Sequence, residues 1–331
     1  MGNMDKLKTQ QKLWKPDKPA SKGATAFHDA VINASWNNDN IIELIKIMQS
    51  KIKENDVVVD FGAGTGASAL RLLERIKFNI NLWLVDNSVS WLTKTYEIFS
   101  NNPNVRCFPL EKIEDKYATL AETIGQESAN HVISANVVHL IPNLEQAFNG
   151  INLALKPRGT FSLGSGNIIR DGREEGILMI DDTVEIVHNI ALDVVRKNSK
   201  FAKYREQLDK KVYIEERQRK AIFPEPRALE LYLKALKSAG FMYESPQYRL
   251  IKVLYKDWLS LLRVKRLEAG TLPEIGGKEP SPEEEKDRDE LITMATNQLF
   301  KELTAKNPYA DSESFTAEWV YVTATKEKYF I

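Results

Sequence analysis

The sequence predicts an α/β fold with a mostly parallel β-sheet and helices on both of its faces. Within 57–76, an apolar strand runs into a turn with three glycines, and apolar residues at helical spacing follow. A second apolar segment, 81–86, ends in an acid, and strand and helix patterns alternate to about residue 166. Such alternation is typical of parallel strands joined by helices that cover the sheet.

The first strand–turn–helix unit carries the strongest signal for a ligand. Residues 57–59 are all valine, which favours a buried strand. Three glycines then let the backbone approach a ligand closely: Gly62, Gly64 and Gly66. The spacing Gly62-x-Gly64-x-x-Ala67 also fits a relaxed dinucleotide fingerprint, so a nicotinamide or flavin enzyme is one alternative. Asp60 opposes it, because a carboxylate here would repel a pyrophosphate but suits a cationic, phosphate-free adenosine compound.

Further strands are predicted in the order that such a sheet needs. They are 105–110, 131–141 with its exit, 160–163, a strand after the helix end at 236–241, and 319–326. Because the carboxyl ends of parallel strands meet at one edge, residues at these exits are expected to converge on one site. The converging residues are Asp60, Asp86, Glu111, Asn136 and Gly164.

Three segments together resemble one protein family. Asp60-x-Gly62-x-Gly64-x-Gly66 resembles the first motif of class I S-adenosylmethionine-dependent methyltransferases. Residues 155–159 resemble the common Leu-Lys-Pro-Gly-Gly lead-in, with Arg158 in place of one glycine, and 236–241 resemble the helix end before the sixth strand. The resemblance covers about 40–165 closely, and 225–255 and 317–326 loosely. It implies a Rossmann-like class I methyltransferase fold: a seven-stranded, mostly parallel sheet with an antiparallel last strand, plus helical lid insertions.

The same resemblance implies S-adenosylmethionine as cofactor and S-adenosylhomocysteine as product. Asp86 would accept both ribose hydroxyls, a device that dinucleotide enzymes share. An acid or its neighbour after the third strand would contact the adenine. The expected cofactor-binding residues are Asp60, Gly62, Gly64, Gly66, Asp86, Asn87, Glu111, Lys112 and Asn136. No metal-binding residues are expected.

The chain divides into seven predicted segments. The family core needs roughly two thirds of the length, so the remainder is expected to form insertions. The segments are a mobile N-terminal arm (1–25), cover helices (26–54), the cofactor-binding core (55–167), a helical lid insertion (168–224), the core continuation (225–255), a second insertion (256–316), and the final strand and tail (317–331). The second insertion would either close the substrate pocket or form a dimer contact. Within it, 270–290 is expected to be a loop of low order.

Methyl transfer from a sulfonium is an in-line displacement that depends mainly on orientation, so no catalytic residue is obligatory. A base helps when the acceptor is a hydroxyl or an acidic carbon. His139, just after the fourth strand, is the first candidate for this base, and His28 in the N-terminal cover is the second. Asn136 is followed by Val-Val-His without the two prolines of amino-group methyltransferases. O- or C-methylation is therefore favoured.

The composition restricts which partners and which cellular location are expected. Lys plus Arg equals Asp plus Glu at 46 each, so no overall field attracts a polyanion, and a nucleic-acid substrate is not expected. Cys107 is the single cysteine, which excludes an internal disulfide. No apolar run approaches the length of a membrane span, and the polar N-terminus is unlike a secretory signal. A cytoplasmic enzyme is expected, with a possible homodimer through the insertions.

The leading hypothesis is a methyltransferase that acts on a small, partly apolar acceptor. The first alternative is a protein or RNA methyltransferase that uses the insertions as a docking surface. The second is a non-catalytic binding module that keeps the fold, although intact Asp60 and Asp86 argue for retained cofactor binding.

Overall fold

The computed structural model describes residues 13–208 and 212–327, so residues 1–12 of the predicted N-terminal arm lie outside the described residues. The helices are α1 Lys22–Asn33, α2 Ser35–Met48, η1 Gln49–Lys51, α3 Ala67–Arg75, α4 Val89–Phe99, α5 Leu120–Ile124, η2 Val138–Leu140, α6 Leu144–Ala154, α7 Asp182–Lys197, η3 Ser199–Gln207, α8 Val212–Ile222, α9 Leu229–Ser238, α10 Tyr255–Leu262, α11 Lys265–Thr271 and α12 Pro282–Lys306. The strands are β1 Val57–Phe61, β2 Asn81–Asp86, β3 Val105–Pro109, β4 Lys112–Ile113, β5 Lys116–Tyr117, β6 Ala129–Ala135, β7 Leu155–Ser165, β8 Ile168–Ile169, β9 Arg227–Ala228, β10 Phe241–Tyr243, β11 Gln247–Leu254 and β12 Ser314–Lys326.

The central sheet confirms the predicted fold class. Its strand order is β10-β12-β7-β6-β1-β2-β3, with β11 also paired to β12. The five strands from β7 to β3 are parallel, whereas β12 runs antiparallel to β7 and to both edge segments. Because β10 and β11 are successive segments on the same side of β12, the eight strands occupy seven positions. The predicted sixth strand is thus split in two.

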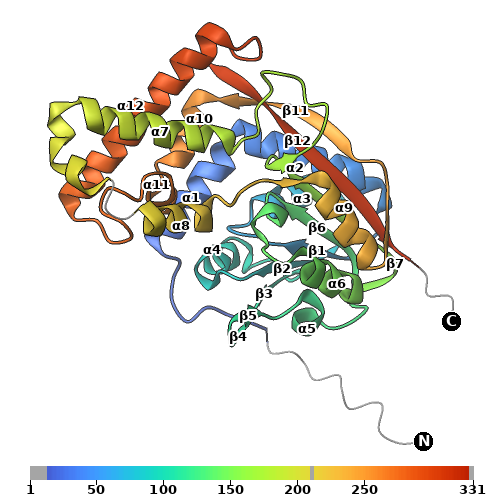
Figure 1. The fold of residues 1–331 in the computed structure, drawn as a ribbon. Helices are drawn as coiled ribbons and strands as arrows, with labels where there is room; N and C mark the ends of the chain where they lie inside the picture. Colours follow the sequence, from blue (N-terminus) through green and yellow to red (C-terminus); the bar gives the residue numbers. More distant parts are fainter. Residues whose placement is uncertain (1–12, 209–211, 328–331) are drawn as a thin grey trace, which may run out of the picture.

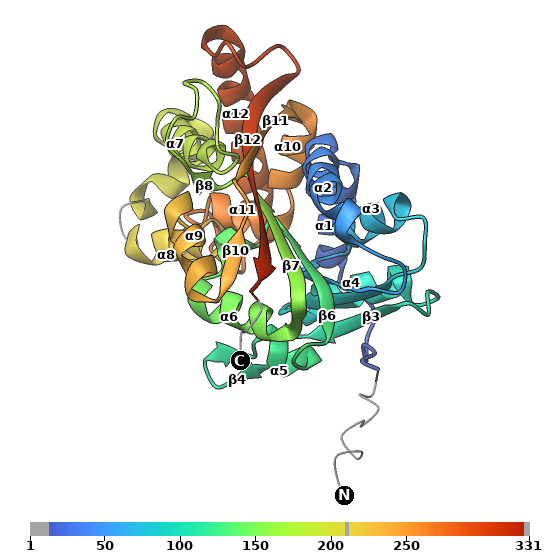
Figure 2. The same ribbon diagram turned by 90° about the vertical axis from the view of Figure 1, so that its right-hand side faces the viewer.

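Helices cover both faces of this sheet, as Figure 2 shows with the sheet close to edge-on. One apolar cluster joins the sheet to α2, α3 and α4 through Leu44, Leu72 and Leu92, which are all fully buried. A second cluster joins the opposite face to α5, α6 and α9 through residues such as Phe148 and Leu236. Both faces of the parallel strands are therefore covered, and even the edge strand β3 contacts α4 and α5.

The insertions form a helical body beside the carboxyl ends of the parallel strands (Figure 1). Helix α7 from the first insertion packs against α12 from the second, and α11 contacts α7, α8 and α10. Residues of α12 that recur every four positions are all buried: Leu291, Ala295, Leu299 and Leu303. The recurrence of these apolar residues at every fourth position predicts a helix, which α12 confirms, and both insertions share one apolar core.

Three local predictions were wrong, each for a physical reason. The expected low-order loop over 270–290 contains the start of α12, because Pro282 is the first helical residue and Ser281 with Glu284 forms a capping box. The spacing Asp182-x-x-Glu185 predicts a capping box at Asp182, but the box is absent, since Asp181 is the N-cap and its side chain makes no capping bond. Helix α1 begins within the predicted arm because Ser21 accepts a hydrogen bond from the Ala24 amide at 3.1 Å.

Candidate cofactor and acceptor site

The glycine turn between β1 and α3 requires glycine at all three positions. Gly62, Gly64 and Gly66 have φ of +80°, +55° and +89°, a left-handed region that disfavours L side chains. A Cβ on Gly62 would lie 2.5 Å from the side chain of Val137, and one on Gly66 would lie 2.9 Å from Phe99. The motif found in the sequence is thus fixed by backbone conformation and by close packing.

Asp86 holds this turn in place from the neighbouring strand. Its Oδ2 accepts a hydrogen bond from the Gly64 amide at 2.8 Å, and its Oδ1 accepts one from the Ser88 amide at 2.7 Å. The carboxyl is 6% exposed, and burial raises its pKa while these backbone bonds and the charge of Arg266 oppose the rise. A carboxylate with two oxygens can accept further bonds.

Asp60 is a fully buried carboxyl without a partner in the described part of the chain. Neither oxygen forms a hydrogen bond, and the side chain is 0% exposed. Burial, with a further contribution from nearby Asp86, raises the pKa of Asp60 to about 7. An unpartnered buried carboxyl costs free energy, so its presence beside the glycine turn indicates a missing positive or donating group. The adjacent Thr65 hydroxyl is buried and likewise lacks a partner among residues 13–208 and 212–327.

The residues expected near the adenine lie beyond the ends of β2 and β3. Asn87, Glu111 and Lys112 are all exposed, and Lys112 lies in β4 of the short β4–β5 hairpin. The amide of Leu110 donates to the carbonyl of Asp86 at 2.9 Å, which ties the end of β3 to the end of β2. These side chains therefore stand at the same sheet edge as the glycine turn.

Asn136 lies at the exit of β6 with φ of +57°, but its side chain is engaged. Its Nδ2 donates to the side-chain oxygens of Asn37 and Asn40 at 3.3 and 3.0 Å. Its Oδ1 accepts a bond from the indole nitrogen of Trp319 at 2.8 Å. The side chain thus joins α2 to β12, and both of its amide hydrogens are used.

His139 lies in η2, directly after the β6 exit. Its Nδ1 is 2.9 Å from the hydroxyl of Ser165 at the end of β7. Burial lowers the pKa of His139 to about 4, and the charge of Arg227 acts in the same direction. The imidazole is therefore neutral at pH 7, which leaves it able to accept a proton but makes it a weak base.

His28 lies in α1 and contacts the glycine turn. Its Nδ1 is 3.1 Å from the carbonyl of Thr65, and burial lowers its pKa. The other two histidines make structural contacts, as expected for a histidine that begins a strand and for one among apolar residues of a helix. His131 lies between Asp56 and Thr160, and His188 in α7 bonds to Glu274 of the second insertion at 2.8 Å.

An aromatic cluster that sequence reasoning partly missed stands beside the turn. Phe27 stacks on Trp91 with centroids 4.4 Å apart, and the guanidinium of Arg266 lies 4.8 Å from the centroid of the same indole. Phe27 lies in the predicted cover segment 26–54, where an aromatic residue is a candidate to cover the site, whereas Trp91 and Arg266 belong to no motif. Trp36, the other aromatic candidate in that segment, is buried against Trp258 and Trp319.

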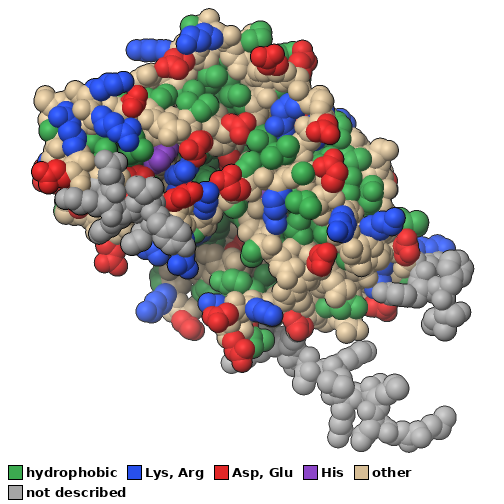
Figure 3. Space-filling model, in the orientation of Figure 1, with side chains coloured by type: hydrophobic (Ala, Val, Ile, Leu, Met, Phe, Trp, Pro, Cys, Tyr) green, Lys and Arg blue, Asp and Glu red, His purple; other side chains and the backbone are tan. Residues whose placement is uncertain are grey.

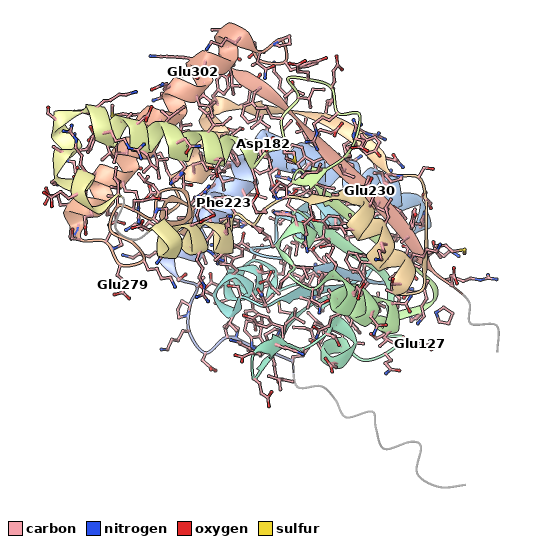
Figure 4. All side chains as sticks on the ribbon, viewed as in Figure 1. Glu127, Asp182, Phe223, Glu230, Glu279 and Glu302 are labelled. Atoms are coloured by element: carbon pink, nitrogen blue, oxygen red, sulfur yellow. The ribbon has the colours of Figure 1, made fainter. Side chains whose placement is uncertain are left out.

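The surface is hollowed between the insertions and the core (Figure 3). Asp182 marks the end of α7 nearest the sheet, and Phe223 follows α8 close by, whereas Glu279 and Glu302 lie at the outer margin (Figure 4). Over residues 13–208 and 212–327, no group of metal-binding side chains gathers. None of the helices described there has both the length and the apolar character to cross a lipid bilayer.

Comparisons with known proteins agree with this geometry. A family profile described as a methyltransferase domain matches residues 52–221, just over half of the 331-residue chain. The solved structure of YcgJ from Bacillus subtilis has 16% identity and a TM-score of 0.50, over 88% of this chain and 99% of that one. A putative methyltransferase from Bacillus halodurans has 16% identity and a TM-score of 0.48, over 88% of this chain and 100% of that one. No curated protein matches the sequence.

The strand order, the glycine turn and the acids at the exits of β1 and β2 combine with the profile match to identify the chain. It belongs to the class I S-adenosylmethionine-dependent methyltransferases, enzymes that transfer a methyl group from S-adenosylmethionine to an acceptor.

Proposed function

We propose that this methyltransferase acts on a small, partly apolar acceptor at oxygen or carbon. The supporting observation is that both insertions meet over the strand exits. Arg266 of α11 reaches Trp91 of α4, and a Cβ on Gly270 of α11 would lie 2.8 Å from Ile222 of α8. An acceptor that enters beneath two packed insertions must be small, whereas a docked macromolecule needs an open basic face.

The residues at the turn fit S-adenosylmethionine. Its amino-acid end is cationic, and the buried Asp60 carboxyl lacks a partner among the described residues. We assign the turn glycines and Asp60 to the methionine end, Asp86 to the ribose, and Asn87, Glu111 and Lys112 to the adenine side. Asn136 contributes through its backbone in this proposal, since its amide hydrogens bond Asn37 and Asn40.

When bound, the cofactor supplies an activated methyl group on a sulfonium. The protein then orients the acceptor in line with that methyl and excludes water, which can contribute ~7–11 kcal/mol. We place His139 beside the acceptor, where its neutral imidazole accepts a hydrogen bond or a proton. His28 acts through the turn by holding the Thr65 carbonyl. The predicted homodimer and the cytoplasmic location stay predictions.

Methyl transfer itself provides the test. The full chain is incubated with tritium-labelled S-adenosylmethionine and either a panel of phenols and 1,3-dicarbonyl compounds, total RNA, or a protein extract. We expect label in the organic-extractable products of the small-molecule arm. Label only in acid-precipitable RNA or protein would contradict the proposal.

A further inference from the structure

Arg227 places a positive charge at the acceptor end of the site. It lies in β9, and the register of the β8–β9 pair sets it opposite Ile168, just beyond the end of β7. Its Nη2 donates to the carbonyl oxygens of Val138 and His139 at 3.0 and 3.1 Å. Both carbonyls belong to η2, so the guanidinium is fixed at the β6 exit, beside which the proposed function places the acceptor.

No carboxylate in the described part of the chain balances this charge. Other partly buried arginines of the same region have such a partner: Arg170 and Arg173 both bind Glu318. The two carbonyl bonds use at most two of the five N–H donors of Arg227. The ring of Tyr232 lies 5.2 Å from the guanidinium carbon and supplies no counter-charge. A partly buried cation without a counter-ion is unfavourable unless a ligand supplies the opposite charge.

A second unmatched group lies just after the end of β7. Asn167 is 0% exposed, and neither atom of its side-chain amide has a hydrogen-bond partner in the parts of the chain described. It precedes Ile168, the residue that the β8–β9 register pairs with Arg227. Its backbone amide donates to the Ser165 hydroxyl at 3.1 Å, and that hydroxyl contacts His139. The unmatched amide thus lies after the end of β7, and the unmatched cation lies at the exit of the neighbouring strand β6.

We propose that the acceptor carries an anionic oxygen group, a carboxylate or a phosphate, that Arg227 binds with the amide of Asn167 as a second donor. The inference rests on the proposed function, because it names the acceptor class of that same site. Guanidinium and anionic oxygen groups form charge-assisted, often bidentate bonds. Held there, the acceptor has one end fixed and presents its methylated atom beside η2.

One nearby acid bears on this assignment. Asp181 follows Ile180, whose amide donates to the carbonyl of Gly166 at 3.1 Å, so its backbone lies near the same end of β7. Burial, together with neighbouring Asp182, raises the pKa of Asp181 to about 7. A carboxyl that is substantially protonated at neutral pH repels an anion only in part and can donate a hydrogen bond.

Four six-carbon probes test the charge preference by calorimetry. Hexanoate, hexyl phosphate, hexanol and hexylamine are titrated into the wild-type protein saturated with S-adenosylhomocysteine. We expect the two anions to bind at least about 10-fold more tightly than hexanol and hexylamine. Whichever of hexanoate and hexyl phosphate binds more tightly then identifies whether the site prefers a carboxylate or a phosphate. Equal binding of hexanol and both anions would overturn the proposal.

Matched variants assign the preference to Arg227. Arg227→Gln removes the charge and keeps an N–H donor for the η2 carbonyls, whereas Arg227→Lys keeps the charge. Arg263→Gln is the control, because Arg263 binds Asp289 on the surface of the insertions. We expect Arg227→Gln alone to lose the anion preference, and Arg227→Lys to retain part of it. An unchanged preference in Arg227→Gln, with unchanged melting temperature, contradicts the proposal.

The two proposals can fail separately. S-adenosylhomocysteine binding is measured first in all four proteins. If wild type does not bind it, the proposed function fails. If all four bind it equally and the anions show no preference, only the acceptor assignment fails.

Discussion

The carboxylate of Asp86 binds the backbone amide of Gly64 at 2.8 Å, so the acid that ends β2 fixes the glycine turn that follows β1. The two features that carried the sequence prediction are thus parts of one structural unit. Because Asp86 also lies near enough to raise the pKa of Asp60, the unit holds two acids in a buried setting. A bound cation relieves this charge, which ties cofactor affinity to the state of both groups.

Replacement of Asp86 tests the ribose assignment. We expect Asp86→Ala to weaken S-adenosylhomocysteine binding by at least about 10-fold, because charge-assisted bonds to the ribose hydroxyls are lost. Calorimetry gives the affinity, and circular dichroism checks that the turn still folds. Asp56→Ala, at the opposite end of the sheet, is the control. Equal affinity of wild type and Asp86→Ala would remove the ribose assignment.

Cofactor affinity should depend on pH through Asp60. Its pKa of about 7 in the free protein means that a cationic cofactor must displace a proton below that pH. We expect the affinity for S-adenosylmethionine to rise between pH 6 and about 8 in wild type and to stay nearly level in Asp60→Asn. Calorimetry in two buffers of different ionisation enthalpy reports the released proton. No proton release at pH 6 would contradict this role.

The free energy of unfolding should also depend on the protonation of Asp60, but it should fall as the pH rises. The folded-state pKa of Asp60 lies above its ordinary value, so the folded state binds the extra proton. Its stabilising effect is complete below about pH 4 and is lost as the pH rises to about 7, at about 1.4 kcal/mol per pH unit. Relative to wild type, Asp60→Asn should therefore gain stability across that window in urea titrations. Parallel curves for both proteins would disprove the shift.

Glycine replacement separates backbone strain from close packing. Gly62 and Gly277 both have positive φ, but only at Gly62 would a Cβ meet another side chain, at 2.5 Å from Val137. We expect Gly277→Ala to lose about 1 kcal/mol of unfolding free energy and Gly62→Ala to lose more. Only the second should also weaken cofactor binding. Equal losses at both positions would show that the contact with Val137 is easily relieved.

His139 is tested by its pH profile once an acceptor is known. Because the pKa of His139 is lowered to about 4, its protonation should reduce the rate only below about pH 5. We expect His139→Ala to lower the maximal rate by about 10-fold or more and to abolish that acidic limb. Ser165→Ala, which removes the partner of Nδ1, should show a smaller loss. Identical rates in wild type and His139→Ala across pH would exclude His139 as the base.

The sequence alone determined the parallel sheet, the cofactor class and the position of the glycine turn. These features are local: alternating apolar runs, glycines at positive φ and acids at strand exits are each encoded within a few residues, as in 57–66. The start of α12 is also encoded locally, by the capping box of Ser281 and Glu284. Pro282 by itself is equally typical of a loop, which is why a loop was expected there.

Only the tertiary structure decided which distant residues complete the site. Arg266 reaches Trp91, and Arg227 binds the carbonyls of Val138 and His139. These residues are too far apart in sequence for a periodic pattern to predict their contacts. Likewise, the side-chain amide of Asn136 donates its hydrogens to α2 because β6, α2 and β12 pack together. Such contacts depend on the docking of whole insertions, which is set by the sum of many apolar contacts rather than by any local pattern.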